Sequence, residues 1–210
     1  MKTPDLILYT DSSPNGFKIT IALEELGLPY VLKHVRIEQG EHRHPDFLKL
    51  NPHGRIPVLV DEDTGVTLFE SAAILMYLAE KTGRLLPDNL VMRWSAITWL
   101  MFHASSMGPL LGQRVQYEIF DTSHSDVGER FRRLTEEAFT TLDNHLKDNF
   151  WLAGPEYSIA DIATFGWMHI AHIINFDFSR FSRLSAWHDR VSQRPAVQRG
   201  INLPQPATGP

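Results

Sequence analysis

The chain has 210 residues, of which 43% are hydrophobic and 21% are charged, and its formal net charge is -5. This composition is typical of a globular protein, and the scattered Lys and Arg residues argue against a nucleic-acid partner. Because the chain has no cysteine, disulfides, thiolate metal sites and a cysteine nucleophile are excluded, so thiol chemistry would need a thiol supplied by a ligand. No apolar run has membrane-spanning length and the N-terminus lacks a signal-peptide pattern, so we expect a cytoplasmic protein with no membrane contact.

Residues 1–85 alternate short strands and helices. The hydrophobic periodicity and the turn residues predict strands at 6–9 and 30–35, helices at 19–26, 45–50 and 72–82, and a β-hairpin at 55–69. This β-α-β-α-β-β-α order predicts an α/β domain with a thioredoxin-like fold over residues 1–85.

The strand signals stop at a linker over residues 85–89. Helical spacing then predicts helices at 91–116, around 131–146, from Ile159 onward and at 184–193, with Ser158 to Asp161 forming a capping box. We therefore expect an all-α helical C-terminal domain over residues 90–204.

The most informative motif joins RIPVLV (55–60) to the Glu70-Ser71 pair across the predicted hairpin. The helix that begins at Glu70-Ser71 offers unpaired N–H groups and a positive dipole to a carboxylate. Glu70 is an acceptor for an amine, and the backbone beside Pro57 can pair with an extended ligand. These features predict a site for a small peptide; the alternative is that Glu70 and Ser71 only cap the helix.

This pattern resembles the glutathione site of the glutathione transferases, and the resemblance spans nearly the whole chain. It implies glutathione as co-substrate, no metal, a homodimer, and a thioredoxin-like domain followed by a helical one. It also implies a cis bond before Pro57, with Ile56 binding the cysteinyl backbone of glutathione. By the same resemblance, Glu70 binds the amine and Ser71 the γ-glutamyl carboxylate.

The turn Ser13-Pro14-Asn15-Gly16 resembles that of the bacterial nu class and of its relative, the prion-forming nitrogen regulator. In that group the hydroxyl residue and the Asn lie nearest the glutathione sulfur, so the resemblance makes Ser13 and Asn15 the catalytic residues. A donor aimed at the sulfur favours the thiolate, which is scarce at neutral pH. Both residues are also common helix caps, and Ser12 is an alternative hydroxyl.

Three basic residues complete the predicted site. The resemblance implies that His42 meets the glycine end of glutathione, that Arg55 pairs with the glycine carboxylate, and that Arg130 reaches a glutathione carboxylate, across the dimer. Each of the three is otherwise a solvated surface residue.

The predicted function is that of a glutathione transferase-like enzyme that activates the glutathione thiol. Two reactions are open: glutathione-dependent disulfide reduction, which we favour, and conjugation to an electrophile. The alternatives are a non-catalytic glutathione-binding regulator and a serine-type transferase that uses Ser12 or Ser13.

Overall fold

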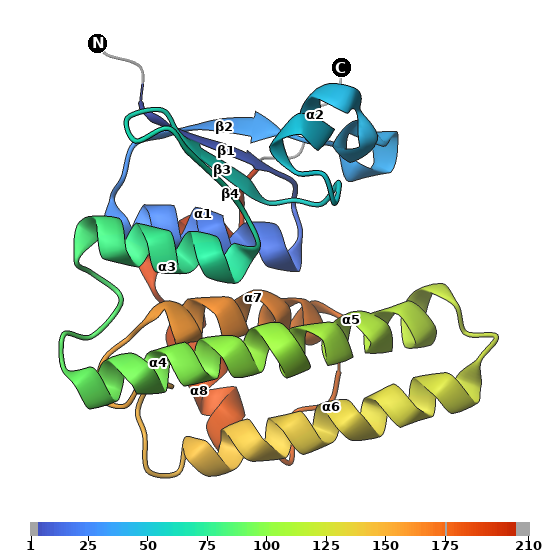
Figure 1. Ribbon diagram of the computed structural model, residues 1–210. Helices are drawn as coiled ribbons and strands as arrows, with labels where there is room; N and C mark the ends of the chain where they lie inside the picture. Colours follow the sequence, from blue (N-terminus) through green and yellow to red (C-terminus); the bar gives the residue numbers. More distant parts are fainter. Residues whose placement is uncertain (1–3, 175, 205–210) are drawn as a thin grey trace. The chain divides into compact units, whose positions relative to one another are not determined.

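The computed structural model describes residues 4–174 and 176–204 of the chain (Figure 1). These residues form two compact units: the first combines the chain up to Arg84 with the segment from Gln193 onward, and the second is Leu85–Ser192. The first unit contains a small sheet with helices and the second is helical, so the predicted fold class is confirmed.

The first unit is built on a four-stranded sheet with strand order β2-β1-β3-β4. β1 pairs in parallel with β2 and antiparallel with β3, and β3 and β4 form the predicted hairpin. Its elements are β1 (Leu6–Thr10), α1 (Pro14–Leu26), β2 (Tyr30–His34), the short 3-10 turns η1 (Ile37–Gln39) and η2 (Glu41–Arg43), α2 (Pro45–Leu50), β3 (Val58–Asp61), β4 (Val66–Phe69), α3 (Ser71–Thr82) and α9 (Pro195–Gly200).

Both faces of this sheet carry apolar side chains. On β1, Leu6 and Leu8 are buried, while the alternate Tyr9 is only half-buried. Helices α1 and α3 lie along one face (Figure 1), where their buried residues complete the main core. Tyr9 belongs instead to a smaller cluster that includes Phe47 of α2 and Val58. The sheet therefore holds the N-termini of α1 and α3 in fixed positions.

The chain returns to the first unit at its C-terminal end, where the sequence analysis expected the helical domain to continue to residue 204. Pro195 begins α9, a helix that was not predicted, and α9 packs on α1. A Cβ at Gly200 would lie 2.7 Å from Ile21 Cα, so only glycine allows this close contact. Thr20 Oγ1 also donates to the Gly200 carbonyl at 2.7 Å. Proline is favoured at the first helical position, and this was the overlooked signal.

The second unit is helical throughout its regular structure. Its elements are α4 (Leu90–Phe102), η3 (His103–Met107), α5 (Gly108–Val115), η4 (Gln116–Phe120), α6 (Ser125–His145), α7 (Ile159–Ile173) and α8 (Ser182–Ser192). Among the described residues of the whole chain, no helix is both long and apolar enough to cross a membrane.

The helix predicted at 91–116 is interrupted in the structure. η3 and η4 are π-helical, and the N–H of Gly108 donates to His103 O, five residues back. The cause of the first interruption is Pro109, which has no N–H and whose ring excludes the carbonyl of residue 105 from its usual position. The wider π turn accommodates the ring without ending the helix.

Asp161 organises the core of the second unit. Its fully buried carboxylate accepts hydrogen bonds from Leu152 N at 3.0 Å and from Trp187 Nε1 at 2.8 Å. The N–H and hydroxyl of Ser158 bond the other oxygen at 3.0 and 3.2 Å, and this closes the predicted capping box of α7. One side chain thus links the start of α7 to α8 and to the segment before α7.

Candidate functional site

The turn between β1 and α1 carries the two residues predicted to address the sulfur. Ser13 is the N-cap of α1, and its Oγ accepts from Gly16 N at 3.0 Å. This is the capping role that was considered as the alternative. A capping hydroxyl still has its own hydrogen to donate. A Cβ on Gly16 would lie 2.3 Å from the Asp11 carbonyl, so the tight turn requires glycine there.

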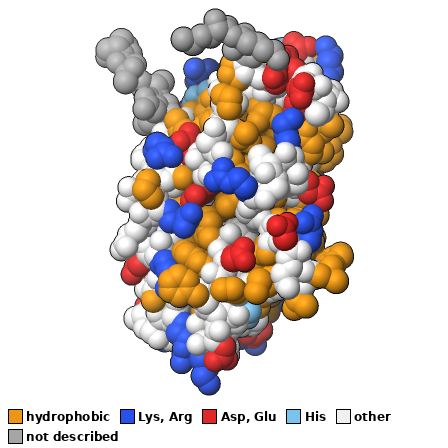
Figure 2. Space-filling model, turned by 90° about the vertical axis from the view of Figure 1, so that its left-hand side faces the viewer, with side chains coloured by type: hydrophobic (Ala, Val, Ile, Leu, Met, Phe, Trp, Pro, Cys, Tyr) orange, Lys and Arg blue, Asp and Glu red, His pale blue; other side chains and the backbone are white. Residues whose placement is uncertain are grey.

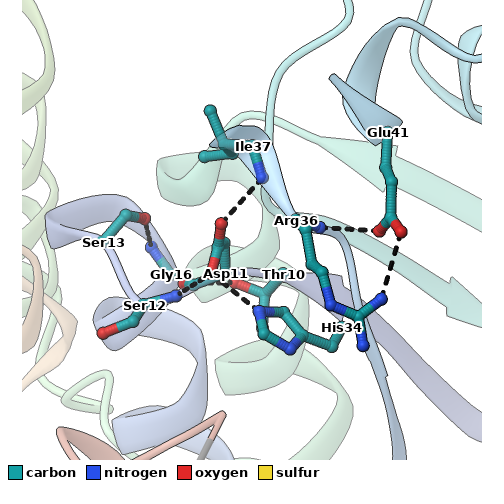
Figure 3. A network of polar contacts seen from close by, with 9 residues as sticks. All are labelled: Thr10, Asp11, Ser12, Ser13, Gly16, His34, Arg36, Ile37 and Glu41. Atoms are coloured by element: carbon teal, nitrogen blue, oxygen red, sulfur yellow. Dashed lines mark hydrogen bonds and ion pairs between the residues drawn. The ribbon is translucent and has the colours of Figure 1, made fainter. Parts of the chain in front are cut away.

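Asp11 ties this turn to the segment after β2 (Figure 3). Its carboxylate contacts His34 Nε2 at 2.8 Å and accepts from the N–H groups of Ile37 at 2.9 Å and Ser12 at 2.8 Å. Burial raises the pKa of Asp11, but these hydrogen bonds outweigh it and hold the pKa below its usual value. The turn is therefore fixed against the segment that leads to His42.

A buried lysine joins the N-termini of α1 and α3. Lys18 is only 3% exposed, and its Nζ donates to Asn15 Oδ1 at 2.8 Å and to Ser71 Oγ at 3.2 Å. Burial lowers the pKa of Lys18 to about 7, and the nearby charge of Glu70 acts against this change. The structure therefore brings Asn15 and Ser71, which are 56 residues apart in sequence, to one ammonium group.

Glu70 has an unusual backbone conformation. It occupies the N-cap position of α3 with φ 72° and ψ 110°, and its side chain is exposed and makes no capping hydrogen bond. A non-glycine residue with positive φ costs stability on the order of 1–3 kcal/mol. The reading of Glu70 as a simple helix cap does not fit, because its carboxylate does not serve the helix.

The remaining predicted residues of the first unit lie on the loops around β3 and α2. The Ile56-Pro57 bond is cis, as predicted, and both residues are buried just before β3. Arg55 is exposed, and its carbonyl accepts from Asn51 Nδ2 at 2.6 Å. His42 lies in η2, and its buried Nδ1 has no hydrogen-bond partner among the described residues.

Arg130 belongs to the second unit. It is exposed on α6, and its predicted contact with glutathione stays a prediction.

The sequence analysis missed Lys18 and Asp11. Lys18 lies inside the apolar run from Phe17 to Leu23, three residues after Asn15, which is the spacing of side chains that meet on a helix. A lysine within an apolar run was therefore the available signal. Asp11 offered no comparable signal, because its partners His34 and Ile37 come from a distant segment.

A cavity of about 770 Å³ opens on the first unit near α2. Its lining includes Tyr9, His34, Arg43 and Phe47, and the described residues around it include none of those predicted to bind glutathione. The described part of the chain also has no group of three or more His, Asp or Glu side chains placed to hold a metal ion.

Comparisons with known proteins show the family of this chain. The sequence model "Glutathione S-transferase, N-terminal domain" matches residues 12–81, and "Glutathione S-transferase, C-terminal domain" matches residues 109–195. The disulfide-bond oxidoreductase YfcG of Escherichia coli is 36% identical over 200 residues, which cover 92% of this chain and 93% of that protein. The chain belongs to the glutathione transferase family.

Two solved structures of family members share the fold closely. A glutathione transferase from Burkholderia graminis, with two glutathione molecules bound per subunit, has a TM-score of 0.91 and 36% identity. The match covers 96% of this chain and 89% of the Burkholderia chain. A glutathione transferase from Pseudomonas putida, with one glutathione disulfide bound per subunit, has a TM-score of 0.89 and 34% identity. The match covers 97% of this chain and 94% of the Pseudomonas chain.

Proposed function

We propose that this family member is a glutathione-dependent enzyme of the nu-class type that reduces disulfides. The observation that carries this proposal is the contact of Lys18 with Asn15 and Ser71, because it unites the residues predicted for the sulfur and for the γ-glutamyl end. The relatives support the choice of reaction: one is a disulfide-bond oxidoreductase, and two hold either two glutathione molecules or glutathione disulfide.

The reaction uses two glutathione thiols because the chain has no cysteine. The first thiolate attacks one sulfur of the substrate disulfide, forms a mixed disulfide with it and releases the other sulfur as a thiol after protonation. The second glutathione thiolate then attacks the glutathione sulfur of the mixed disulfide. Glutathione disulfide forms and the second substrate thiol leaves, so two glutathiones lose two electrons to the substrate.

Asn15 and Ser13 stabilise the reacting sulfur. Both lie at the N-terminus of α1, where unpaired N–H groups and the helix dipole favour an anion. The Asn15 side-chain N–H and the Ser13 hydroxyl are the donors to the thiolate, and together they lower the pKa of the bound thiol. Ser12 is exposed just before the helix, and the alternative serine-type mechanism would use Ser12 or Ser13 in place of Asn15.

The other predicted residues hold the peptide. Glu70 pairs with the glutathione amine, and Ser71, at the start of α3, binds the γ-glutamyl carboxylate. The backbone of Ile56 beside Pro57 pairs with the cysteinyl residue. In this proposal the glycine end is bound by the side chains of His42 and Arg55, and Arg130 reaches a glutathione carboxylate across the dimer.

We also propose that the chain acts as a homodimer. Apolar side chains on the exposed surface of α4 support this, among them Leu90 at 68%, Val91 at 78% and Trp94 at 59% exposure. Orange hydrophobic areas of the surface are visible in Figure 2 between charged side chains. A symmetric dimer would cover such a face. We place the enzyme in the cytoplasm, where glutathione is kept reduced.

One pair of assays tests the function. With glutathione present, the protein should turn over a model disulfide, and its activity toward a model aryl halide should be lower. Faster turnover of the aryl halide would favour conjugation by the same thiolate. If calorimetry detects glutathione binding but neither substrate reacts, the protein is a glutathione-binding regulator, and the proposed activity is wrong.

A further inference from the structure

Lys18 has no role in the site predicted from the family resemblance, yet it lies at the centre of that site. It belongs to α1, one turn after Asn15, and it is buried among the core residues of the first unit. Burying an ammonium group is costly, so a lysine in this position is retained only where its hydrogen bonds compensate. Its ammonium group donates hydrogen bonds to two residues of the candidate site, Asn15 and Ser71.

The chemistry of the lysine determines how Asn15 is oriented. The ammonium form of Lys18 has hydrogens to donate and no lone pair with which to accept, so the atom of Asn15 that faces it is the amide oxygen. The planar amide then presents its NH₂ end away from Lys18. Without the lysine, the amide could rotate and place its oxygen, which repels a thiolate, toward the sulfur.

The same reasoning applies to Ser71. Its Oγ accepts from Lys18 at 3.2 Å, so the hydroxyl hydrogen is directed elsewhere and can be donated to a carboxylate. The negative charge of Glu70 favours the protonated form of Lys18 and thus strengthens both bonds.

We propose that Lys18 is a positioning residue that turns the donor groups of Asn15 and Ser71 toward bound glutathione. This inference rests on the proposed function, because it assumes that glutathione binds between these two helix N-termini. Lys18 acts on the sulfur through Asn15 and on the γ-glutamyl end through Ser71, without touching the reacting atoms.

The test compares Lys18→Met with Lys81→Met in the full-length protein. Lys81 is a suitable control because it is also a helical lysine of the first unit, and it pairs with the buried Asp61 at 2.7 Å rather than with site residues. The readouts are the affinity for glutathione by calorimetry and the pH midpoint of thiolate formation by the ultraviolet absorbance of the bound thiolate.

Lys18→Met should weaken glutathione binding about tenfold and raise the thiolate midpoint by about one pH unit, while Lys81→Met should change neither. Lys18→Gln keeps an N–H donor and should partly restore both values. It also serves as the test variant if Lys18→Met does not fold. Unchanged affinity and midpoint in the Lys18 variant that folds would overturn the inference.

A double-mutant cycle separates positioning from a general structural effect. If Lys18 acts on the sulfur through Asn15, Lys18→Met should no longer move the thiolate midpoint in an Asn15→Ala background. Additive changes would show that Lys18 acts independently of Asn15, and this would contradict the proposal. If the unmodified protein does not bind glutathione at all, the proposed function itself is wrong. That result differs from an unchanged Lys18 variant and from an additive double-mutant cycle, which contradict only the role of Lys18.

Discussion

Asp161 and Lys18 are buried charged side chains, one in each unit, and they differ in the groups that they contact. Asp161 accepts hydrogen bonds from two backbone N–H groups, the Ser158 hydroxyl and the Trp187 indole. Lys18 donates instead to Asn15 and Ser71, two residues of the candidate site. Burial moves both pKa values toward the neutral forms, to about 6 for Asp161 and about 7 for Lys18. The partners, and not the burial, therefore distinguish the structural role of Asp161 from the positioning role that we propose for Lys18.

The largest effect that we expect comes from Asp161→Ala. The substitution leaves the N–H groups of Leu152 and Trp187 buried without an acceptor and removes half of the capping box, so the free energy of unfolding should fall by about 3 kcal/mol. Urea denaturation measures this, with the exposed Asp148→Ala as control. An equal decrease in the free energy of unfolding of the two variants would show that Asp161 has no special structural role.

Lys18→Met should change how stability depends on pH. The pKa of Lys18 is lowered from 10.5 to about 7 in the folded protein, so the unfolded chain holds the proton more tightly between these values. Lys18 therefore makes the free energy of unfolding rise with pH across this window, by a few kcal/mol at most. Denaturation from pH 7 to pH 10 should show this rise in the unmodified protein and lose it in Lys18→Met. If the free energy of unfolding changes with pH in the same way in the unmodified protein and in Lys18→Met, Lys18 stays charged from pH 7 to pH 10.

Asn15→Ala should lower turnover more than it lowers glutathione affinity. Loss of one donor to the thiolate should reduce kcat by about 10- to 100-fold and raise the pKa seen in the pH dependence of the rate. Ser13→Ala is the matched variant in the same turn, and its effect should be smaller and of the same sign. If Ser13→Ala abolishes activity while Asn15→Ala leaves the pH profile unchanged, the serine-type mechanism is correct.

Glu70 allows the smallest and most selective test. Glu70→Gly relieves the positive φ and should raise the free energy of unfolding by about 1 kcal/mol, while glutathione binding weakens. Glu70→Gln keeps a side chain at this positive φ, so it should weaken glutathione binding without raising the free energy of unfolding. Thermal denaturation and calorimetry on the pair separate the two contributions. A Gly variant with full affinity would exclude Glu70 from the site.

Local patterns were sufficient to predict most of the first unit from the sequence. The parallel β1–β2 pair, the hairpin, the 45–50 helix and the helix that begins at Glu70-Ser71 all depend on periodicity, turn residues and caps that lie close together in sequence. The same kind of signal identified the capping box of α7.

Contacts between distant segments could not be predicted in this way. The pairing of Asp11 with His34, the meeting of Lys18 with Ser71, and the packing of α9 on α1 all depend on the finished fold. The π turn before Pro109 was missed for another reason, because the long apolar pattern of α4 and α5 continues through it. The candidate site was thus predicted as a set of residues, but not with the charges that organise it.

The return of α9 to α1 has a consequence for synthesis of the chain. Domains usually begin to fold from the N-terminus while the ribosome is still adding residues. Here the first unit stays incomplete until the segment through Gly200 has emerged, because Arg194 pairs with Glu25 and Gly200 packs on Ile21. The first unit therefore cannot complete its folding until the whole helical unit has been translated. Until then, the surface of α1 that α9 covers stays exposed.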